Sequence, residues 1–224
     1  MDKYKQEFIE FMVKSGVLIF GDFTTKSGRK TPYFVNTGNY KTGRQIAKLG
    51  EYYAECVHRN VPGKIDALFG PAYKGIPLAV AAAVSLYNRF GEDVNYCFNR
   101  KEAKDHGEGG SIVGYKPQDG DRVVIIEDVI TAGTSIRETL PVLKAAADVS
   151  PAGLIISVDR MERGVGNKTP IEEIYEEFGI ETYPIVTVRE IIDALTNREV
   201  GGRVYIDDAV KAAMEAYLEK YCVV

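Results

Sequence analysis

The sequence predicts an α/β fold in which a central parallel sheet is flanked by helices. From residue 65 to residue 158, short apolar runs alternate with longer segments of helical character, the pattern of a parallel sheet covered on both faces. The runs at residues 123–126 and 154–158 are continuously apolar, as expected for strands buried from both sides. With 224 residues, no internal repeat and no long linker, the whole chain 1–224 is predicted to form one domain.

The N-terminal segment predicts a helix and a small antiparallel lobe. An apolar stripe at helical spacing predicts a helix over about residues 2–15, and the stripe consists of Tyr4, Phe8, Phe11 and Met12. Two β-prone pieces at residues 17–19 and 33–35 are separated by glycine and proline, which predicts a short antiparallel element. We call the lobe formed by about residues 1–40 the hood.

The remaining elements follow in order. Thr42 and Gln45 have the spacing of a capping box, so a second helix should run from there to about Asn60. The later elements are predicted as a strand at 65–69, a helix at 75–89, strands at 94–98 and 123–126, a helix at 134–147, strands at 153–158 and 182–186, and a C-terminal helix around 210–218. Ligands of open parallel sheets bind outside the carboxyl ends of the strands.

Composition narrows the class of partner. The longest apolar stretch, Ile76 to Val84, is far shorter than the roughly 20 residues of a membrane span, and the charged N-terminus lacks a signal-peptide core. We therefore expect a cytoplasmic protein without a membrane partner. The formal net charge of -4 argues against a broad nucleic-acid surface, which favours a small-molecule partner. The three cysteines lack metal-ligand spacing and are expected to be reduced thiols.

Two carboxylates stand at the predicted carboxyl end of a central strand. Glu127 and Asp128 follow the apolar run 123–126, and small and hydroxylated residues follow them at Thr131 to Ser135. Backbone N–H groups of such a loop, together with the positive end of the next helix, can hold a phosphate. The acids would repel a phosphate, so they are expected to accept hydrogen bonds from sugar hydroxyls or from water around a divalent cation. A sugar phosphate would suit both the acids and the phosphate-binding loop. The alternative is that the segment is a solvated acidic turn followed by a helix cap.

The same segment carries a family resemblance. Four apolar residues, two acids, two apolar residues and T-A-G-T-S resemble the fingerprint of type I phosphoribosyltransferases, which bind phosphoribosyl diphosphate (PRPP). The resemblance implies their fold, a parallel sheet with a small N-terminal hood. No P-loop and no complete G-x-G-x-x-G pattern is present, which disfavours the ordinary nucleotide-binding folds.

Three further segments narrow the resemblance. Gly70 to Gly75 is similar to the diphosphate loop of the family, although a plain β–α turn with an exposed lysine is the alternative. Phe98 to Gly110 and Lys26 to Phe34 resemble the catalytic loop and the substrate-binding stretch of orotate phosphoribosyltransferases. A solvated charged surface is the alternative for the second of these segments. The resemblance extends from about Phe20 to Gly164.

This resemblance implies a reaction and its site. Orotate would react with PRPP and Mg²⁺ to give orotidine 5′-monophosphate and diphosphate in pyrimidine biosynthesis. It implies PRPP contacts from Lys26, Tyr73, Lys74, Arg100, Lys101, Lys104, His106, Glu127, Asp128, Val129, Ile130, Thr131, Ala132, Gly133, Thr134 and Ser135. Orotate contacts are implied for Phe34, Val35, Thr131 and Arg160. An ion pair is the alternative for Arg160, and a surface lid position is the alternative for His106.

The catalytic assignments follow from charge. Loss of diphosphate builds positive charge on the ribose and negative charge on the leaving group, so cations and carboxylates are needed on opposite sides. The expected catalytic residues are Lys26, Lys104, His106 and Asp128. Mg²⁺ would be held mainly by the substrate, with Glu127 and Asp128 nearby. Orotate can attack through its own ring nitrogen, so no protein nucleophile is required.

The resemblance also implies assembly and motion. A mobile lid over about residues 101–112 would exclude water, and in the family this lid reaches the neighbouring subunit, which predicts a homodimer with shared sites. Two residues depart from the common family pattern: Glu127 stands where Asp is frequent, and Val35 where a second Phe is common. The rival functions are a purine or uracil phosphoribosyltransferase and a regulator that senses PRPP and binds nucleic acid.

Overall fold

The computed structural model describes residues 1–25, 28–101, 111–164 and 166–223. A six-stranded sheet with the order β5-β4-β3-β6-β7-β8 lies at its centre. The strands are β3 (Ala67–Phe69), β4 (Asn95–Asn99), β5 (Ile112–Gly114), β6 (Arg122–Ile126), β7 (Ser150–Asp159) and β8 (Thr182–Thr187). All pair in parallel except β5, which runs antiparallel to β4. The predicted parallel sheet is therefore confirmed, with one antiparallel edge strand that the sequence did not predict.

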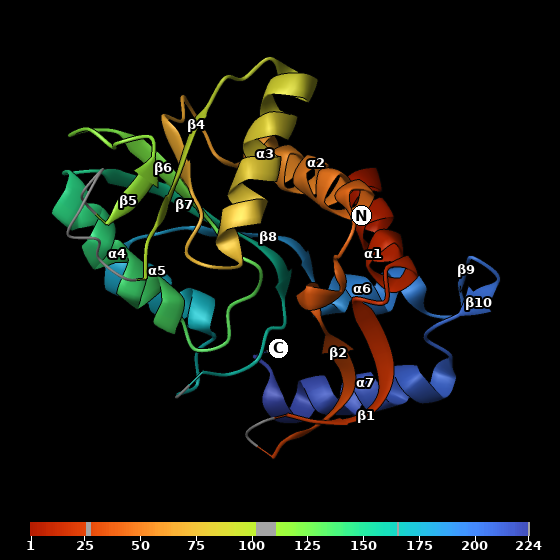
Figure 1. Cartoon of the computed structure of the whole chain (residues 1–224). Helices are drawn as coiled ribbons and strands as arrows, with labels where there is room; N and C mark the ends of the chain where they lie inside the picture. Colours follow the sequence, from red (N-terminus) through yellow and green to blue (C-terminus); the bar gives the residue numbers. More distant parts are fainter. Residues whose placement is uncertain (26–27, 102–110, 165, 224) are drawn as a thin grey trace.

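Helices cover both faces of the sheet. They are α1 (Lys3–Lys14), the 3-10 turn η1 (Thr37–Asn39), α2 (Gly43–Asn60), α3 (Gly75–Phe90), α4 (Thr134–Ala146), α5 (Pro170–Phe178), α6 (Val188–Leu195) and α7 (Asp208–Tyr221). Figure 1 shows α2 and α3 on one side of the sheet and α4 and α5 on the other. Helices α5 and α6 were not predicted from the sequence.

Strand β6 shows why the sequence runs of the central strands are continuously apolar. Val124 and Ile126 belong to the core that contains residues of α2 and α3, whereas Val123 and Ile125 belong to a second core beside α4. All four side chains are completely buried. Alternate side chains of a strand point to opposite faces, so a strand between two cores must be apolar throughout, as predicted.

The N-terminal strands form a separate small sheet. Strands β1 (Leu18–Thr24) and β2 (Lys30–Val35) pair in antiparallel fashion, as predicted. Helix α7 lies against them (Figure 1), and the rings of Tyr33 and Tyr217 meet edge to face with centroids 5.9 Å apart. A further short pair, β9 (Glu199–Val200) and β10 (Arg203–Val204), stands apart at the right of Figure 1.

Two smaller expectations, the cap of α2 and the unpaired cysteines, are confirmed. The capping box of Thr42 and Gln45 begins α2, and such caps contribute about 1 kcal/mol. Cys56, Cys97 and Cys222 are free and buried. In the described ranges of the chain, no helix is both long and apolar enough to span a membrane.

The order of the strands places two loops side by side. After β3 the chain adds β4 on one side and later returns through β6 on the other, which creates a topological switch point at the carboxyl ends of β3 and β6. The helix that follows β3 begins at Gly75, where an added Cβ atom would lie 2.8 Å from the carbonyl oxygen of Ile126. Glycine is required for this approach, and the two loops meet at one edge of the sheet.

Candidate active site at the carboxyl edge of the sheet

The carboxylate of Asp128 is held at this edge by donors from three parts of the chain. Thr37 Oγ1 donates to Oδ2 over 2.7 Å, and Lys74 Nζ lies 2.8 Å from the same oxygen. The backbone N–H of Val129 donates to Oδ1 over 2.8 Å. Asp128 is 7% exposed, whereas the side chain of Lys74 is 67% exposed. The acid is therefore fixed, and the lysine can reorient.

Glu127 is buried beside it. Ser135 Oγ donates to one of its carboxylate oxygens, and the backbone N–H of Asp128 donates to the other over 3.3 Å. Burial raises the pKa of Glu127 above its ordinary value, and the hydrogen bond from Ser135 opposes this only in part. A buried carboxyl with a raised pKa at a sheet edge is a feature of functional sites.

The backbone that carries the two acids is anchored from behind. Tyr53 Oη donates to the carbonyl oxygen of Glu127 over 2.7 Å, and Ser157 Oγ donates to that of Asp128 over 2.5 Å. Sequence reasoning missed both residues and also Thr37. Their partners lie far away along the chain, and no local pattern signals such pairs.

The loop that follows Asp128 ends at the N-terminus of α4, the kind of position where proteins bind anions. Gly133 has φ +67 and directly precedes the first helical residue, Thr134. The first N–H groups of a helix lack partners within it and carry partial positive charge. Arg137 fixes the loop because its Nη1 donates to the carbonyl oxygen of Ala132 over 2.6 Å. Thr131, Thr134 and Ser135 are exposed at this helix start.

The loop from Gly70 to Gly75 lies at the same edge. Its Ala72–Tyr73 peptide bond is cis, and the N–H of Ala72 donates to Asn99 Oδ1 over 2.8 Å. Tyr73 is 70% exposed, and Lys101 Nζ lies 5.6 Å from the centre of its ring. Cationic and aromatic groups from two loops therefore flank the switch point.

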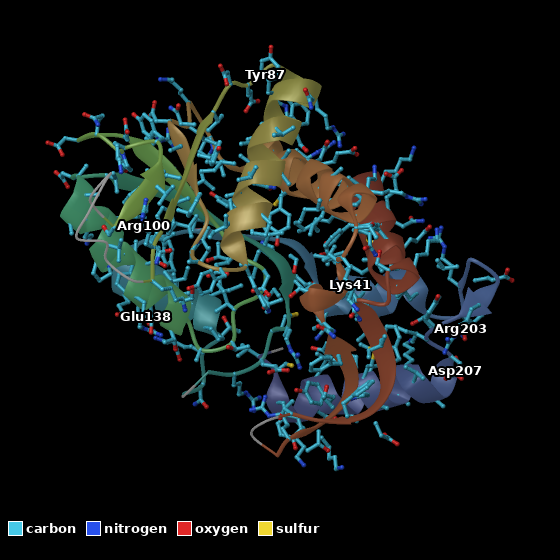
Figure 2. All side chains as sticks on the ribbon, in the orientation of Figure 1. Lys41, Tyr87, Arg100, Glu138, Arg203 and Asp207 are labelled. Atoms are coloured by element: carbon cyan, nitrogen blue, oxygen red, sulfur yellow. The ribbon has the colours of Figure 1, made fainter. Side chains whose placement is uncertain are left out.

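Arg100 follows β4 on the half of the molecule that carries α4 (Figure 2). Its backbone N–H donates to the carbonyl oxygen of Ser111 over 2.8 Å. Its Nε is buried and has no hydrogen-bond partner in the described part of the chain. A buried guanidinium nitrogen without a partner is costly, which favours an anionic ligand at this position.

Arg160 lies in a second cluster near the end of β7. Its Nη2 is 2.6 Å from Glu162 Oε1, an oxygen that also accepts the hydroxyl of Tyr217 over 2.6 Å. The guanidinium lies 4.9 Å from the centre of the Tyr33 ring. Burial disfavours the charged form, but Tyr33 and Glu162 outweigh it and raise the pKa of Arg160. The ion pair considered for this residue from the sequence is therefore present.

Of the other residues predicted for orotate, Phe34 and Val35 lie on β2, next to Tyr33, and Thr131 lies in the loop after β6. Phe34 follows Tyr33 on β2 and is 37% exposed, and Val35 ends the strand. An isolated bridge between Val129 and Val158 brings the end of β7 beside the loop after β6. The cluster of Arg160 and the carboxylate edge thus belong to neighbouring strands.

A small cavity lies beneath the ion pair of Lys74 and Asp128. Its volume is about 110 Å³, and it is lined by Thr37, Gly38, Tyr40, Ile46, Leu49, Tyr53, Lys74, Pro77, Leu78, Asp128 and Ser157. The lining surface is mostly apolar, and its polar residues Thr37, Lys74 and Ser157 each bond to Asp128. Lys26, Lys104 and His106, and most of the predicted lid at 101–112, lie outside the described residues.

Comparison with known proteins decides the family. Residues 36–181 match the sequence model of the phosphoribosyl transferase domain. The chain is 59% identical to the orotate phosphoribosyltransferase of Lachnoclostridium phytofermentans, over 99% of this chain and 98% of that protein. The chain belongs to the orotate phosphoribosyltransferase family.

Other members of the orotate phosphoribosyltransferase family agree in sequence and in fold. The enzyme of Clostridium beijerinckii is 57% identical over 99% of both chains. The crystal structure of orotate phosphoribosyltransferase from Francisella tularensis superposes with a TM-score of 0.83 at 36% identity, covering 96% of this chain and 99% of that one. The type I phosphoribosyltransferase fold expected from the sequence is thereby confirmed.

Proposed function

We propose that this chain transfers the 5-phosphoribosyl group from PRPP to orotate, which yields orotidine 5′-monophosphate and diphosphate. The observation that carries the proposal is the meeting of Asp128, Lys74 and the helix start after Gly133 at one switch point. A ribose with phosphates at both ends needs acceptors for its diol, cations for its diphosphate and N–H donors for its 5′-phosphate. The family places this reaction in the de novo synthesis of UMP.

The ribose and its 5′-phosphate are assigned to the loop after β6. Asp128 and Glu127 accept hydrogen bonds from the ribose hydroxyls; both residues are buried and directly follow β6. The 5′-phosphate is held by the loop from Thr131 to Ser135, where helix-terminal N–H groups and hydroxyls are concentrated. Val129 and Ile130 supply the backbone between the two parts.

Cations around the switch point stabilise the leaving diphosphate. The described ones are Lys74, Arg100 and Lys101, with Tyr73 beside them; Lys26, Lys104 and His106 complete the proposed set. Fixed positive charge placed where negative charge develops lowers the barrier without reorganisation. Lys104 and His106 belong to the proposed lid of residues 101–112, whose closure excludes water and so suppresses hydrolysis of PRPP.

Orotate is assigned to Phe34, Val35, Thr131 and Arg160. The guanidinium of Arg160 is a planar donor suited to the carboxylate and carbonyl oxygens of orotate, and Phe34 offers a partly exposed ring on β2. The residues 1–40 act as a hood over this side of the site, within a single domain of 224 residues. Orotate attacks through its own nitrogen, so the chain supplies position and charge rather than a nucleophile.

Mg²⁺ is proposed as the cofactor and is held mainly by PRPP. In the described ranges, no group of three or more His, Cys, Asp or Glu side chains could hold a metal ion. Glu127 and Asp128 nevertheless offer neighbouring carboxylate oxygens, the ligand type that Mg²⁺ prefers together with phosphate and water. The ion would neutralise charge on the diphosphate, and Glu127 and Asp128 would orient water around it and the ribose diol.

The working form is proposed to be a cytoplasmic homodimer in which the lid of one subunit reaches the site of the other. Mixing a Lys104→Ala protein with an Asp128→Asn protein should then restore activity in the heterodimers, because one site keeps both groups. If the mixture recovers nothing, shared sites are excluded.

The reaction is tested by a spectroscopic assay in which orotate, uracil and hypoxanthine compete as acceptors. Consumption of orotate alone, dependent on PRPP and Mg²⁺, is the expected result. Consumption of uracil or hypoxanthine would indicate the rival transferases. Binding of PRPP without turnover of any acceptor would indicate a sensor instead.

A further inference from the structure

Thr37 links the hood to the carboxylate edge of the sheet. It stands in η1, the turn that connects β2 to α2. Its hydroxyl donates to Asp128 Oδ2 over 2.7 Å, although the two residues are 91 positions apart. Lys74 Nζ lies 3.3 Å from the same hydroxyl oxygen. A neutral side chain thus shares one carboxylate oxygen with a lysine.

The turn that carries Thr37 is anchored independently of the acid. Asn36 N–H donates to the carbonyl oxygen of Val17 over 2.8 Å, and Tyr40 N–H donates to that of Thr37 over 3.2 Å. Asn39 Nδ2 donates to the carbonyl oxygen of Gly16 over 2.7 Å. Because both flanks of Thr37 are tied to the start of β1, its short side chain presents the hydroxyl from a fixed position.

The two donors to Asp128 Oδ2 differ in what the reaction asks of them. Lys74 is a long, exposed side chain, and the proposed function assigns it to the diphosphate. When its ammonium turns to that group, the carboxylate keeps Thr37 on Oδ2 and the N–H of Val129 on Oδ1. Two donors on different oxygens, one from each side, prevent rotation of the carboxylate.

We propose that Thr37 is a positioning residue: its hydroxyl fixes the carboxylate of Asp128 in the orientation that receives the ribose diol of PRPP. The inference rests on the proposed function, because it requires Asp128 to bind the ribose. Thr37 itself remains behind the acid and does not touch the reacting atoms. Through it, the hood contributes to binding of the sugar as well as to binding of orotate.

The test measures binding of PRPP with Mg²⁺ by calorimetry, and the Michaelis constant for orotate, in Thr37→Val and Thr37→Ser. Valine keeps the shape and removes the donor, so affinity for PRPP should fall about ten-fold. Serine keeps the hydroxyl, so Thr37→Ser should retain most of the affinity for PRPP. The Michaelis constant for orotate should stay unchanged in both. Thr37→Ala serves as a second variant if the valine protein does not fold.

A matched control is Thr42→Val, five positions along the same connection. This variant removes the hydroxyl that caps α2 by accepting from Gln45 N–H, a contact that does not involve Asp128. It should lower the midpoint of thermal unfolding without changing affinity for PRPP. If Thr42→Val weakens PRPP binding as much as Thr37→Val does, loss of stability explains both, and the inference fails.

The double variant Thr37→Val with Asp128→Asn separates this inference from the proposed function. If Thr37 acts through Asp128, the double variant binds PRPP no more weakly than Asp128→Asn alone. A further loss of about ten-fold in that background would overturn the inference. If Thr37→Val binds PRPP normally and Asp128→Asn binds it weakly, this inference fails while the proposed ribose contact of Asp128 stands. Normal affinity in Asp128→Asn would overturn the proposed ribose contact, and this inference with it.

Discussion

The ammonium group of Lys74 lies 2.8 Å from Asp128 Oδ2, so a cation and an acid from adjacent loops neutralise each other at the edge of the sheet. In the proposed function, Lys74 binds the diphosphate of PRPP and Asp128 binds the ribose hydroxyls. Binding of PRPP would exchange this ion pair for a contact of lysine with diphosphate and a contact of carboxylate with the ribose diol. The pair therefore marks the point where the two halves of the substrate meet.

Lys74→Met tests the cationic half. Methionine keeps an unbranched apolar stem and lacks the ammonium group. Affinity for PRPP should therefore fall by about ten- to a hundred-fold, because a charge-assisted contact is lost. The free energy of unfolding should change by less than about 1 kcal/mol, since ion pairs of exposed lysines contribute little. Lys64→Met, which removes an exposed partner of Asp66, is the control. Unchanged turnover and affinity in Lys74→Met would remove the residue from the mechanism.

Arg160→Lys tests the orotate half. Lysine keeps the charge but loses the planar fork and the stacking on Tyr33, so the Michaelis constant for orotate should rise by roughly ten-fold or more while that for PRPP stays within about two-fold. Arg29→Lys is the matched control, because Arg29 pairs with the same Glu162 and stacks on Tyr221. Equal effects in the two variants would mean that the cluster is structural.

Glu127→Gln tests the buried acid through stability and pH. The pKa of Glu127 is raised by burial, so its contribution to stability is fully present below its unfolded pKa and is lost as pH rises through the folded one. Glutamine still accepts from Ser135 and carries no charge. At pH 7 the variant should unfold about 3 °C higher than the wild type, a gain of roughly 1 kcal/mol, while it binds PRPP more weakly. The difference should vanish near pH 4, where the carboxyl is neutral, and a constant difference across pH would contradict this origin.

Thr182→Val tests a buried hydroxyl in β8. Thr182 Oγ1 is buried and unpaired within the described residues, so replacing it with a methyl group should raise the free energy of unfolding by about 1 kcal/mol. Thr31→Val is the counterpart, because the Thr31 hydroxyl donates to the carbonyl oxygen of Tyr33 over 3.0 Å. That variant should be destabilised by a similar amount in thermal or urea unfolding. A loss of stability in Thr182→Val would show that its hydroxyl has a partner.

The central strands were predictable because burial on both faces leaves a local trace. Val123 to Ile126 must be apolar throughout when one core lies on each side. Edge strand β5 leaves no such trace, because only Ile112 of its three residues is buried, whereas Val113 is partly buried and Gly114 is exposed. Helices α5 and α6 were missed although both begin with a T-x-x-E capping box, Thr169 with Glu172 and Thr187 with Glu190. Greater weight on that pattern would have found them.

The part of the candidate site that consists of consecutive residues could be predicted from the sequence. Glu127, Asp128 and the loop to Ser135 form one continuous segment, so their chemistry can be read locally. The contacts of Asp128 with Thr37 and Lys74 join residues 91 and 54 positions apart. Only the fold brings them together, because η1 and the loop after β3 both reach the switch point.

A crystal structure of the chain with PRPP and Mg²⁺ would show directly whether the ribose binds at Asp128. We expect ribose hydroxyls within about 3 Å of the Asp128 carboxylate, the 5′-phosphate on the N–H groups of residues 131–135, and Lys74 turned from Asp128 to the diphosphate. A ribose bound elsewhere, with Lys74 still paired to Asp128, would contradict this expectation.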